Sequence, residues 1–310
     1  MRTVIEPGRK RKSINFIDNI VYSVQKDLNG NEMELKMSIM LQNGNSEMRL
    51  AAGRDDEDED KLPKPAILWV PGGGYRGCDK NLMVAEMAFL ADAGFVVASM
   101  YYRSSAEGHF PDQIIDVKTA LRFLRAHAAE YEIDPDHIGL IGRSAGGHLS
   151  ALAAMNSACY ESEEWEGFSS DVQACCDLFG PVDLVKLMEF DAEMMEKDPS
   201  YRWKRVEDTH AGALFGGPVE TMKERARLAS PPYVLSNEMC PILILHGDQD
   251  ALVPCEISEN FYKSIADAGM EERADFYILK GAGHGTKEFF QPYVKELIAA
   301  FFNQHLRNST

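Results

Sequence analysis

Polar and apolar residues alternate along the first part of the chain, from Ile14 to about Arg49. The stretch MELKMSIMLQ, residues 33–42, shows this most clearly. A period of two residues puts successive side chains on opposite faces of an extended strand. The pattern therefore predicts antiparallel strands at the start of the fold.

Farther along, short apolar runs bounded by glycine or proline alternate with helix-like segments. The apolar runs predict strands at residues 66–70, 95–100, 138–142, 174–179, 242–247 and 276–279. The segments between them predict helices at residues 83–93, 112–130, 145–155, 257–268 and 287–305. Strands that are apolar throughout and alternate with helices predict an α/β fold, in which helices cover both faces of a mostly parallel sheet.

One interval interrupts this alternation. Between Gly180 and Tyr233 no comparably clear strand occurs, and the segment mixes Met, Trp and Phe with charged residues. We expect an insertion over the C-terminal edge of the sheet, where ligands bind in open α/β folds. The expected cap spans residues 183–229 within a single domain of residues 1–310.

Composition and charge favour a globular protein and disfavour polyanionic partners. The 310 residues are 45% hydrophobic, which is enough for one large core. A formal net charge of −17 disfavours binding to nucleic acid or to an anionic membrane surface. The acidic run Asp55–Asp60 is expected to be a solvated loop, and the basic run Arg9–Lys12 a frayed terminus. No stretch has the apolar length of a signal peptide or a membrane span, so a soluble cytoplasmic protein is expected.

The cysteines suggest neither zinc binding nor redox chemistry, because no C-x-x-C spacing occurs. We expect all six to be reduced thiols, and we expect no metal and no cofactor. The six are Cys78, Cys159, Cys175, Cys176, Cys240 and Cys255.

Three consecutive glycines follow the predicted strand at residues 66–70, in the stretch AILWVPGGGYRGC. The spacing from Gly72 to Gly77 matches the G-x-G-x-x-G of dinucleotide-binding folds, which also need an acidic residue at the end of the next strand. The next strand continues as VVASMYYR, residues 96–103, and offers no such residue. The sequence therefore favours a loop whose N–H groups face some other developing negative charge.

The stretch HIGLIGRSAGGHLSALAAM, residues 137–155, carries the most specific motif. It places Gly142, Ser144 and Gly146 as G-x-S-x-G between a predicted strand and a predicted helix. Small flanking residues permit the sharp turn that exposes such a serine above a sheet. We therefore predict that Ser144 is a nucleophile.

A nucleophilic serine needs a base to accept its proton and an acid to orient that base. The segment LILHGDQDALVP presents two candidate acids after a strand, and we favour Asp250, with Asp248 shaping the turn and Asp183 a distant third. The later segment LKGAGHGTKEF holds His284 in a glycine-rich loop. Among the eight histidines we therefore favour His284 as the base, and we expect His148, inside the helix, to pack.

These motifs, together with YYRSSAEGHFPDQIIDVKTALRFL, GALFGG and ASPPYVL, resemble α/β-hydrolases of the esterase/lipase branch. That branch includes hormone-sensitive-lipase-like esterases and bifunctional feruloyl and acetyl-xylan esterases, and the resemblance runs from about Val21 to the end. It implies that the N–H groups of Gly73, Gly74 and Ala145 form an oxyanion hole. The chain departs from the commonest family pattern at Pro71, where His is usual, and at Arg143.

The resemblance implies a serine carboxylic-ester hydrolase that acts through an acyl-enzyme on a small-molecule ester. Short or hydroxycinnamoyl acyl groups, carried on fragments of plant carbohydrate, are the expected substrates. The expected substrate-binding residues are Tyr75, Phe190, Trp203 and Phe215, although the aromatic residues of the cap could equally form its own small core.

Two other functions stay open at this point. The same residues could hydrolyse an amide, as kynurenine formamidase or a prolyl-oligopeptidase-like peptidase does, and the fold also serves as a non-catalytic small-molecule receptor. The natural acyl and alcohol groups stay open too, as does assembly into a homo-oligomer. The same region of resemblance predicts a structural ion pair between Arg103 and Asp116.

Overall fold

The computed structural model describes residues 3–4, 13–42, 63–217 and 219–307. The acidic run 55–60 and the basic run 9–12 lie outside these ranges. Within them one sheet has eight strands in the order β1-β2-β4-β3-β5-β6-β7-β8. The strands are β1 (Ile14–Lys26), β2 (Glu32–Gln42), β3 (Lys64–Val70), β4 (Val96–Met100), β5 (Ile133–Arg143), β6 (Ala174–Leu178), β7 (Ile242–Gly247) and β8 (Ala274–Leu279).

The sheet is antiparallel at one side and parallel elsewhere. β1 pairs with β2, and β2 with β4, in antiparallel fashion. All pairs from β4 through β3 to β8 are parallel. This confirms the antiparallel start that the alternating residues predict and the parallel sheet that the continuous apolar runs predict.

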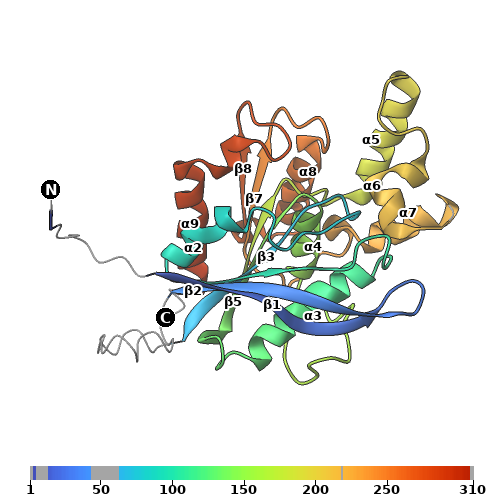
Figure 1. Cartoon of the computed structure of the whole chain (residues 1–310). Helices are drawn as coiled ribbons and strands as arrows, with labels where there is room; N and C mark the ends of the chain where they lie inside the picture. Colours follow the sequence, from blue (N-terminus) through green and yellow to red (C-terminus); the bar gives the residue numbers. More distant parts are fainter. Residues whose placement is uncertain (1–2, 5–12, 43–62, 218, 308–310) are drawn as a thin grey trace.

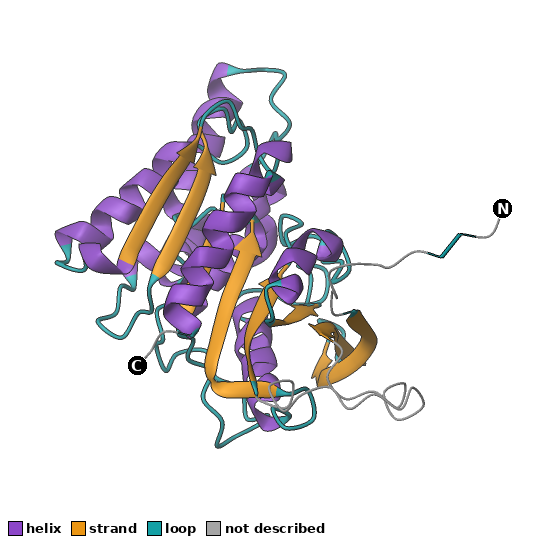
Figure 2. Ribbon diagram, turned by 90° about the vertical axis from the view of Figure 1, so that its left-hand side faces the viewer, coloured by secondary structure: helices purple, strands orange, loops and turns teal. Residues whose placement is uncertain are grey.

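Helices cover both faces of the sheet (Figures 1 and 2). One face packs against α3 (Asp112–Ala126), α4 (Ala145–Ala153) and α8 (Cys255–Asp267), and the other against α2 (Ala88–Asp92) and α9 (Pro292–Leu306). The 3-10 helices η2 (Val84–Met87) and η6 (Lys287–Phe290) precede α2 and α9, and η5 (Glu271–Arg273) precedes β8.

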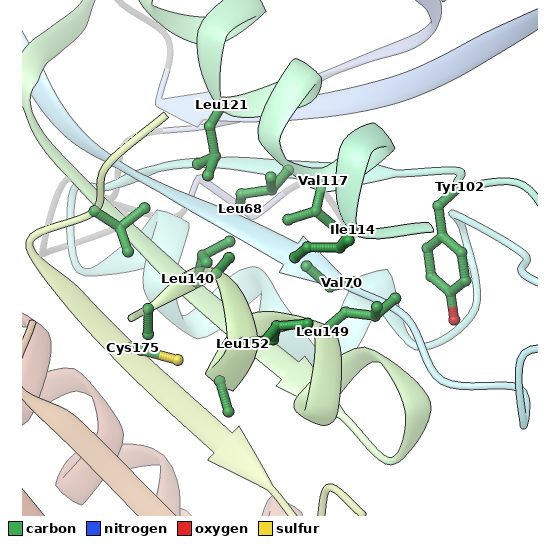
Figure 3. Packing of buried hydrophobic residues seen from close by; sticks show 14 of the residues in the cluster. Leu68, Val70, Tyr102, Ile114, Val117, Leu121, Leu140, Leu149, Leu152 and Cys175 are labelled. Atoms are coloured by element: carbon green, nitrogen blue, oxygen red, sulfur yellow. The ribbon is translucent and has the colours of Figure 1, made fainter. Parts of the chain in front are cut away.

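Successive strand residues alternate between the two cores. Leu68 and Val70 of β3 join the core under α3 and α4, whereas Ile67 and Trp69 join the core under α2 and α9. Figure 3 shows the first of these cores, with Leu68 and Val70 lying among side chains of α3 and α4. Both faces of the strand are buried, which explains why its sequence is apolar without interruption.

In the predicted cap region, residues 183–229, the described residues form helices and no strand. This region holds α5 (Leu184–Lys197), η3 (Val206–Asp208), α6 (His210–Phe215) and α7 (Val219–Leu228), and η4 (Pro231–Tyr233) follows it. The Asp183 side chain accepts a hydrogen bond from the backbone N–H of Lys186 and so caps the first turn of α5. Figure 1 shows α5, α6 and α7 together at one side of the molecule.

Three other expectations concern the described residues. Arg103 and Asp116 form the predicted ion pair, with 2.7 Å between Nη2 and Oδ1, and both side chains are buried. All six cysteines are free thiols, as expected, and Cys175 and Cys176 are buried on β6. No helix in these ranges is both long enough and apolar enough to cross a membrane.

Candidate active site

Ser144 occupies a sharp turn between β5 and α4. Its backbone angles are φ 51° and ψ −124°, which a residue with a side chain seldom adopts. The turn is crowded: a Cβ on Gly142 would lie 2.2 Å from the Gly146 carbonyl oxygen, and a Cβ on Gly146 would lie 2.0 Å from the Val70 carbonyl oxygen. Only glycine fits at both positions, so the local sequence produces the turn that G-x-S-x-G predicts.

The structure brings Ser144, His284 and Asp250 together from three separate loops. The Nε2 atom of His284 lies 2.9 Å from the Ser144 Oγ, and its Nδ1 atom lies 2.7 Å from Asp250 Oδ2. Asp250 follows β7 and His284 follows β8, while Ser144 follows β5. The C-terminal ends of parallel strands share one edge of the sheet, which explains how residues 140 positions apart come to touch.

Asp250 is held as a carboxylate. Its Oδ1 atom accepts hydrogen bonds from the backbone N–H groups of Leu252 and Val253, at 2.8 and 2.9 Å. Burial alone would raise the pKa of Asp250, but hydrogen bonds from His246 and His284 outweigh it and hold that pKa well below its ordinary value. The carboxylate therefore keeps its charge, and its second oxygen is available to orient His284.

Asp248, the alternative acid, lies elsewhere. Its carboxylate accepts a hydrogen bond of 2.6 Å from the backbone N–H of Gly281, so it holds the loop that leads to His284. The sequence reasoning missed His246, whose Nε2 atom lies 3.3 Å from Asp250 Oδ2. His246 is fully buried, and its Nδ1 atom lies 2.7 Å from Ser258 Oγ. In the sequence, its position four residues before Asp250, at the end of a predicted strand, could have indicated this contact.

The glycine-rich loop after β3 lies beside Ser144. Gly73 and Gly74 have φ values of 148° and 60°, and a Cβ on Gly73 would lie 1.8 Å from the Gly77 carbonyl oxygen. Gly72 lies against the serine turn, because its Cβ would come within 2.8 Å of the Arg143 carbonyl oxygen. The N–H groups of Gly73 and Gly74 donate no hydrogen bond to any described residue, so both are free to bind a ligand.

Tyr75 continues that loop but points inward. Its side chain is buried, and its hydroxyl lies 2.9 Å from His148 Nδ1. His148 Nε2 lies 2.6 Å from the Ala229 carbonyl oxygen. Because a carbonyl only accepts, Nε2 carries the proton and Nδ1 accepts from Tyr75. Burial lowers the pKa of His148 to about 4, which keeps the ring neutral. His148 packs, as the sequence analysis expected.

A small cavity of about 10 Å³ lies next to the serine. Gly74, Tyr75, Ser144 and Ala145 line one side of it, and the cap supplies the opposite side with Leu187, Asp191, Trp203 and His210. Its remaining lining residues are Pro181, Leu252 and Val253. Gly74 and Ala145, two of the three predicted oxyanion-hole residues, therefore share this cavity with Ser144.

Of the four predicted substrate-binding residues, Tyr75 and Trp203 line this cavity and two do not. Phe215 is 1% exposed and packs edge-on against Phe110, with ring centroids 5.9 Å apart. Phe190 is half-buried and packs against the same core. These two aromatic residues of the cap belong to the apolar core, which the sequence pattern alone could not distinguish from a cavity wall.

A larger cavity of about 470 Å³ borders His284. Its lining includes His284, Gln249 and Leu252, together with Asp198, Ser200, Tyr201, Arg202 and Ala251. Leu252 lines both cavities. Arg143 is not among the lining residues of either cavity, and its guanidinium is above the Phe179 ring, 5.9 Å from the centroid.

No group of three or more His, Cys, Asp or Glu side chains suited to a metal ion occurs among the residues that the structure describes. The chemistry that the arrangement can perform is that of an activated serine. A hydroxyl, a histidine and an ionised carboxylate in one hydrogen-bonded chain can deliver the serine oxygen as a nucleophile.

Solved esterases share this fold. A protein described as a truncated form of carbohydrate esterase from gut microbiota has a TM-score of 0.74 and 28% identity, with coverage of 96% of this chain and 98% of that one. A thermophilic esterase from Thermogutta terrifontis has a TM-score of 0.66 and 23% identity, with coverage of 96% and 95%. The sheet order, the helices on both faces and the serine turn define an α/β-hydrolase.

The BD-FAE family model matches residues 56–265, and the chain belongs to that family. Esterase LipC of Mycobacterium tuberculosis is 30% identical over 232 residues, which are 74% of this chain and 55% of LipC. Isoprenylcysteine alpha-carbonyl methylesterase ICME of Arabidopsis thaliana is 26% identical over 235 residues, 74% of this chain and 52% of that protein. The chain thus spans about half the length of these curated relatives.

Proposed function

We propose that the protein is a carboxylic-ester hydrolase in which Ser144 attacks the ester carbonyl and forms an acyl-enzyme. The observation that carries this proposal is the hydrogen-bonded chain from Ser144 through His284 to Asp250, with contacts of 2.9 and 2.7 Å. Both contacts fall within the reach required for proton transfer and for orienting a base. The names of the relatives, which are esterases, agree with this chemistry.

In the proposed mechanism, His284 Nε2 takes the Ser144 proton as Oγ bonds to the carbonyl carbon. The carbonyl oxygen becomes negative, and the N–H groups of Gly73, Gly74 and Ala145 stabilise it. His284 then gives its proton to the departing alcohol, and the same residues hydrolyse the acyl-enzyme with a water molecule. Asp250 stays ionised throughout and stabilises the His284 cation.

The two cavities suggest which side of the ester is small. The leaving oxygen must lie near His284, which protonates it, so the alcohol occupies the cavity of about 470 Å³ that His284 lines. The acyl group then faces the cavity of about 10 Å³ beside Ser144, which has space for about one water molecule. We infer a preference for short acyl groups over hydroxycinnamoyl groups, with a larger polar alcohol such as a carbohydrate fragment.

Two measurements test this proposal. A fluorophosphonate should label Ser144 covalently, and labelling should vanish in Ser144→Ala. Among p-nitrophenyl esters from acetyl to decanoyl, kcat/KM should be highest for the shortest acyl groups, and acetylated xylo-oligosaccharides should be better substrates than methyl ferulate. N-formylkynurenine, an amide, should be a poor substrate. An enzyme that labels but prefers the amide would overturn the ester assignment while leaving the nucleophile in place.

A further inference from the structure

The cavity beside Ser144 is mostly apolar, but the cap contributes two polar side chains to it. Asp191 of α5 is 3% exposed, and its Oδ1 atom accepts a hydrogen bond of 2.5 Å from the Tyr201 hydroxyl. His210, the first residue of α6, is the other. Its Nδ1 atom is buried beside the backbone of Gly74 and has no hydrogen-bond partner of good geometry among the described residues. A buried polar atom without a partner is unfavourable, so a ligand that supplies one is favoured.

His210 is held in place from two sides. Its ring stands edge-on to Trp203, with centroids 5.2 Å apart and planes at 81°. The edge that carries Nδ1 faces the glycine-rich loop, since a Cβ on Gly74 would lie 2.3 Å from that atom. Arg76 of the same loop donates hydrogen bonds to the carbonyl oxygens of Asp208 and Thr209, at 2.5 and 3.1 Å. The imidazole is thus fixed next to a proposed oxyanion-hole residue.

The electrostatic surroundings favour a neutral ligand group. Burial, followed by the charges of Arg76 and Arg202, lowers the pKa of His210 to about 4. At neutral pH the ring is therefore uncharged and can donate one hydrogen bond or accept one. The two guanidinium groups that disfavour a charged imidazole also disfavour an ammonium group on the ligand, whereas a hydroxyl suits the imidazole, the carboxylate and the volume of about 10 Å³.

We propose that this cavity is a hydroxyl-binding subsite and that His210 makes the enzyme prefer short 2-hydroxyacyl esters, such as glycolyl and lactyl esters, over acetyl and propionyl esters. The hydroxyl bonds to His210 Nδ1 while the acyl carbonyl faces Gly73 and Gly74. This inference rests on the proposed esterase function and adds the class of acyl group. A site built to hydrogen-bond a substrate hydroxyl discriminates strongly against the analogue that lacks it.

The experiment compares kcat/KM for phenyl lactate and phenyl propionate, and for phenyl glycolate and phenyl acetate. Each ratio is divided by the ratio of the uncatalysed hydroxide rates, which removes the intrinsic reactivity of the ester. In the wild type we expect corrected ratios of about tenfold or more in favour of the hydroxyl esters. His210→Leu should bring them close to one. His210→Asn, whose side-chain amide places a polar nitrogen near the position of Nδ1, should restore most of the preference.

Corrected ratios near one in the wild type, or equal ratios in the wild type and His210→Leu, would overturn the subsite while hydrolysis of phenyl acetate still supports the esterase. Loss of all hydrolysis by the wild type would instead overturn the proposed function. A second measurement needs no variant: lactate should slow fluorophosphonate labelling of wild-type Ser144 at lower concentration than propionate does. Equal protection by the two acids would contradict the subsite even if His210→Leu failed to fold.

Discussion

The C-terminal edge of the sheet and the cap both contribute to the cavity beside Ser144, but they are built differently. At the sheet edge the backbone itself is closely packed. If Gly146 carried a Cβ, that atom would lie only 2.0 Å from the Val70 carbonyl oxygen. The cap reaches the cavity through side chains. Among them are Trp203 and His210, whose ring centroids are 5.2 Å apart. Backbone packing tolerates little change, whereas side chains on a separate helical segment can be exchanged.

This difference separates chemistry from selectivity. We expect substitutions at the sheet edge to abolish turnover, because the proposed reacting groups lie there within 2.9 Å of each other. We expect substitutions in the cap to change which ester is preferred, because cap residues border the cavity but are not members of the hydrogen-bonded chain from Ser144 to Asp250. Five predictions test the division, and they begin with the largest effect.

Ser144→Ala should lower kcat by about 10⁴ to 10⁶, because only binding and the oxyanion hole then contribute to the rate. His284→Ala should be similarly damaging. The measurement is turnover of p-nitrophenyl acetate, with thermal unfolding as the test that each variant still folds. A folded variant that keeps a tenth of wild-type kcat would show that the sheet edge does not supply the nucleophile.

Asp250→Asn should lower kcat by about 10³ to 10⁴, because an amide favours the wrong tautomer of His284. Asp248→Asn is the matched control, since among the described residues this carboxylate accepts its hydrogen bond from the Gly281 backbone. We expect Asp248→Asn to lower kcat by less than about fivefold, because it alters no group that faces His284. Equal losses in the two variants would assign the acid role to the loop as a whole instead of to Asp250.

Asp116→Ala should lower the free energy of unfolding by about 3 to 5 kcal/mol, because it removes the buried carboxylate that pairs with the buried Arg103 guanidinium. Asp112, which also lies near Arg103 but has a side chain that is 31% exposed, provides the control. Asp112→Ala should cost less than about 1 kcal/mol. Urea unfolding measures the free energy of unfolding of both variants. Similar losses in the two variants would mean that burial of the pair contributes little to stability.

The contribution of His148 to stability should fall as the pH is lowered from about 6.5 toward 4, whereas Asp177 and Asp116, whose pKa values burial raises to about 7 and about 6, act in the opposite direction. His148 has a folded-state pKa of about 4 against an ordinary value of 6.5. In that pH range the unfolded chain binds a proton that the folded chain excludes, so acid favours unfolding. The contribution is about 1 to 3 kcal/mol. His148→Gln should remove this contribution from the pH dependence that urea unfolding measures at several pH values, and parallel curves would contradict the assignment.

Arg76→Ala should have the smallest effect, a decrease in kcat/KM on the order of 3- to 10-fold with an unchanged melting temperature. The variant loses the hydrogen bonds to the carbonyl oxygens of Asp208 and Thr209 and the stacking on Trp203. Arg205→Ala, at a side chain that is 66% exposed, is the matched control and should leave kcat/KM unchanged. If both variants behave alike, the cap does not depend on the glycine-rich loop for its position.

Much of the sheet and its edge could be predicted from local sequence. The apolar run at 242–247 coincides with β7, and the predicted helix at 145–155 differs from α4 by two residues at its end. The predicted helix at 112–130 was too long, since α3 ends at Ala126. These elements follow from periodicity and from glycine, which act over a few residues. The same reasoning selected Ser144, Asp250 and His284 for contacts that the structure then displays.

Long-range packing decided the rest. The sequence pattern around an aromatic residue of the cap is the same whether its side chain faces a cavity or a core. Only the fold shows that Trp203 lines the cavity and that Phe215 does not. The hydrogen bonds from Tyr75 through His148 to the Ala229 carbonyl oxygen join positions far apart in the chain. The sequence by itself determined the sheet and the serine turn, because strand periodicity and glycine sterics are local. Only the tertiary structure determined the shape and polarity of the cavity, because its walls come from loops and helices that meet only when the chain is folded.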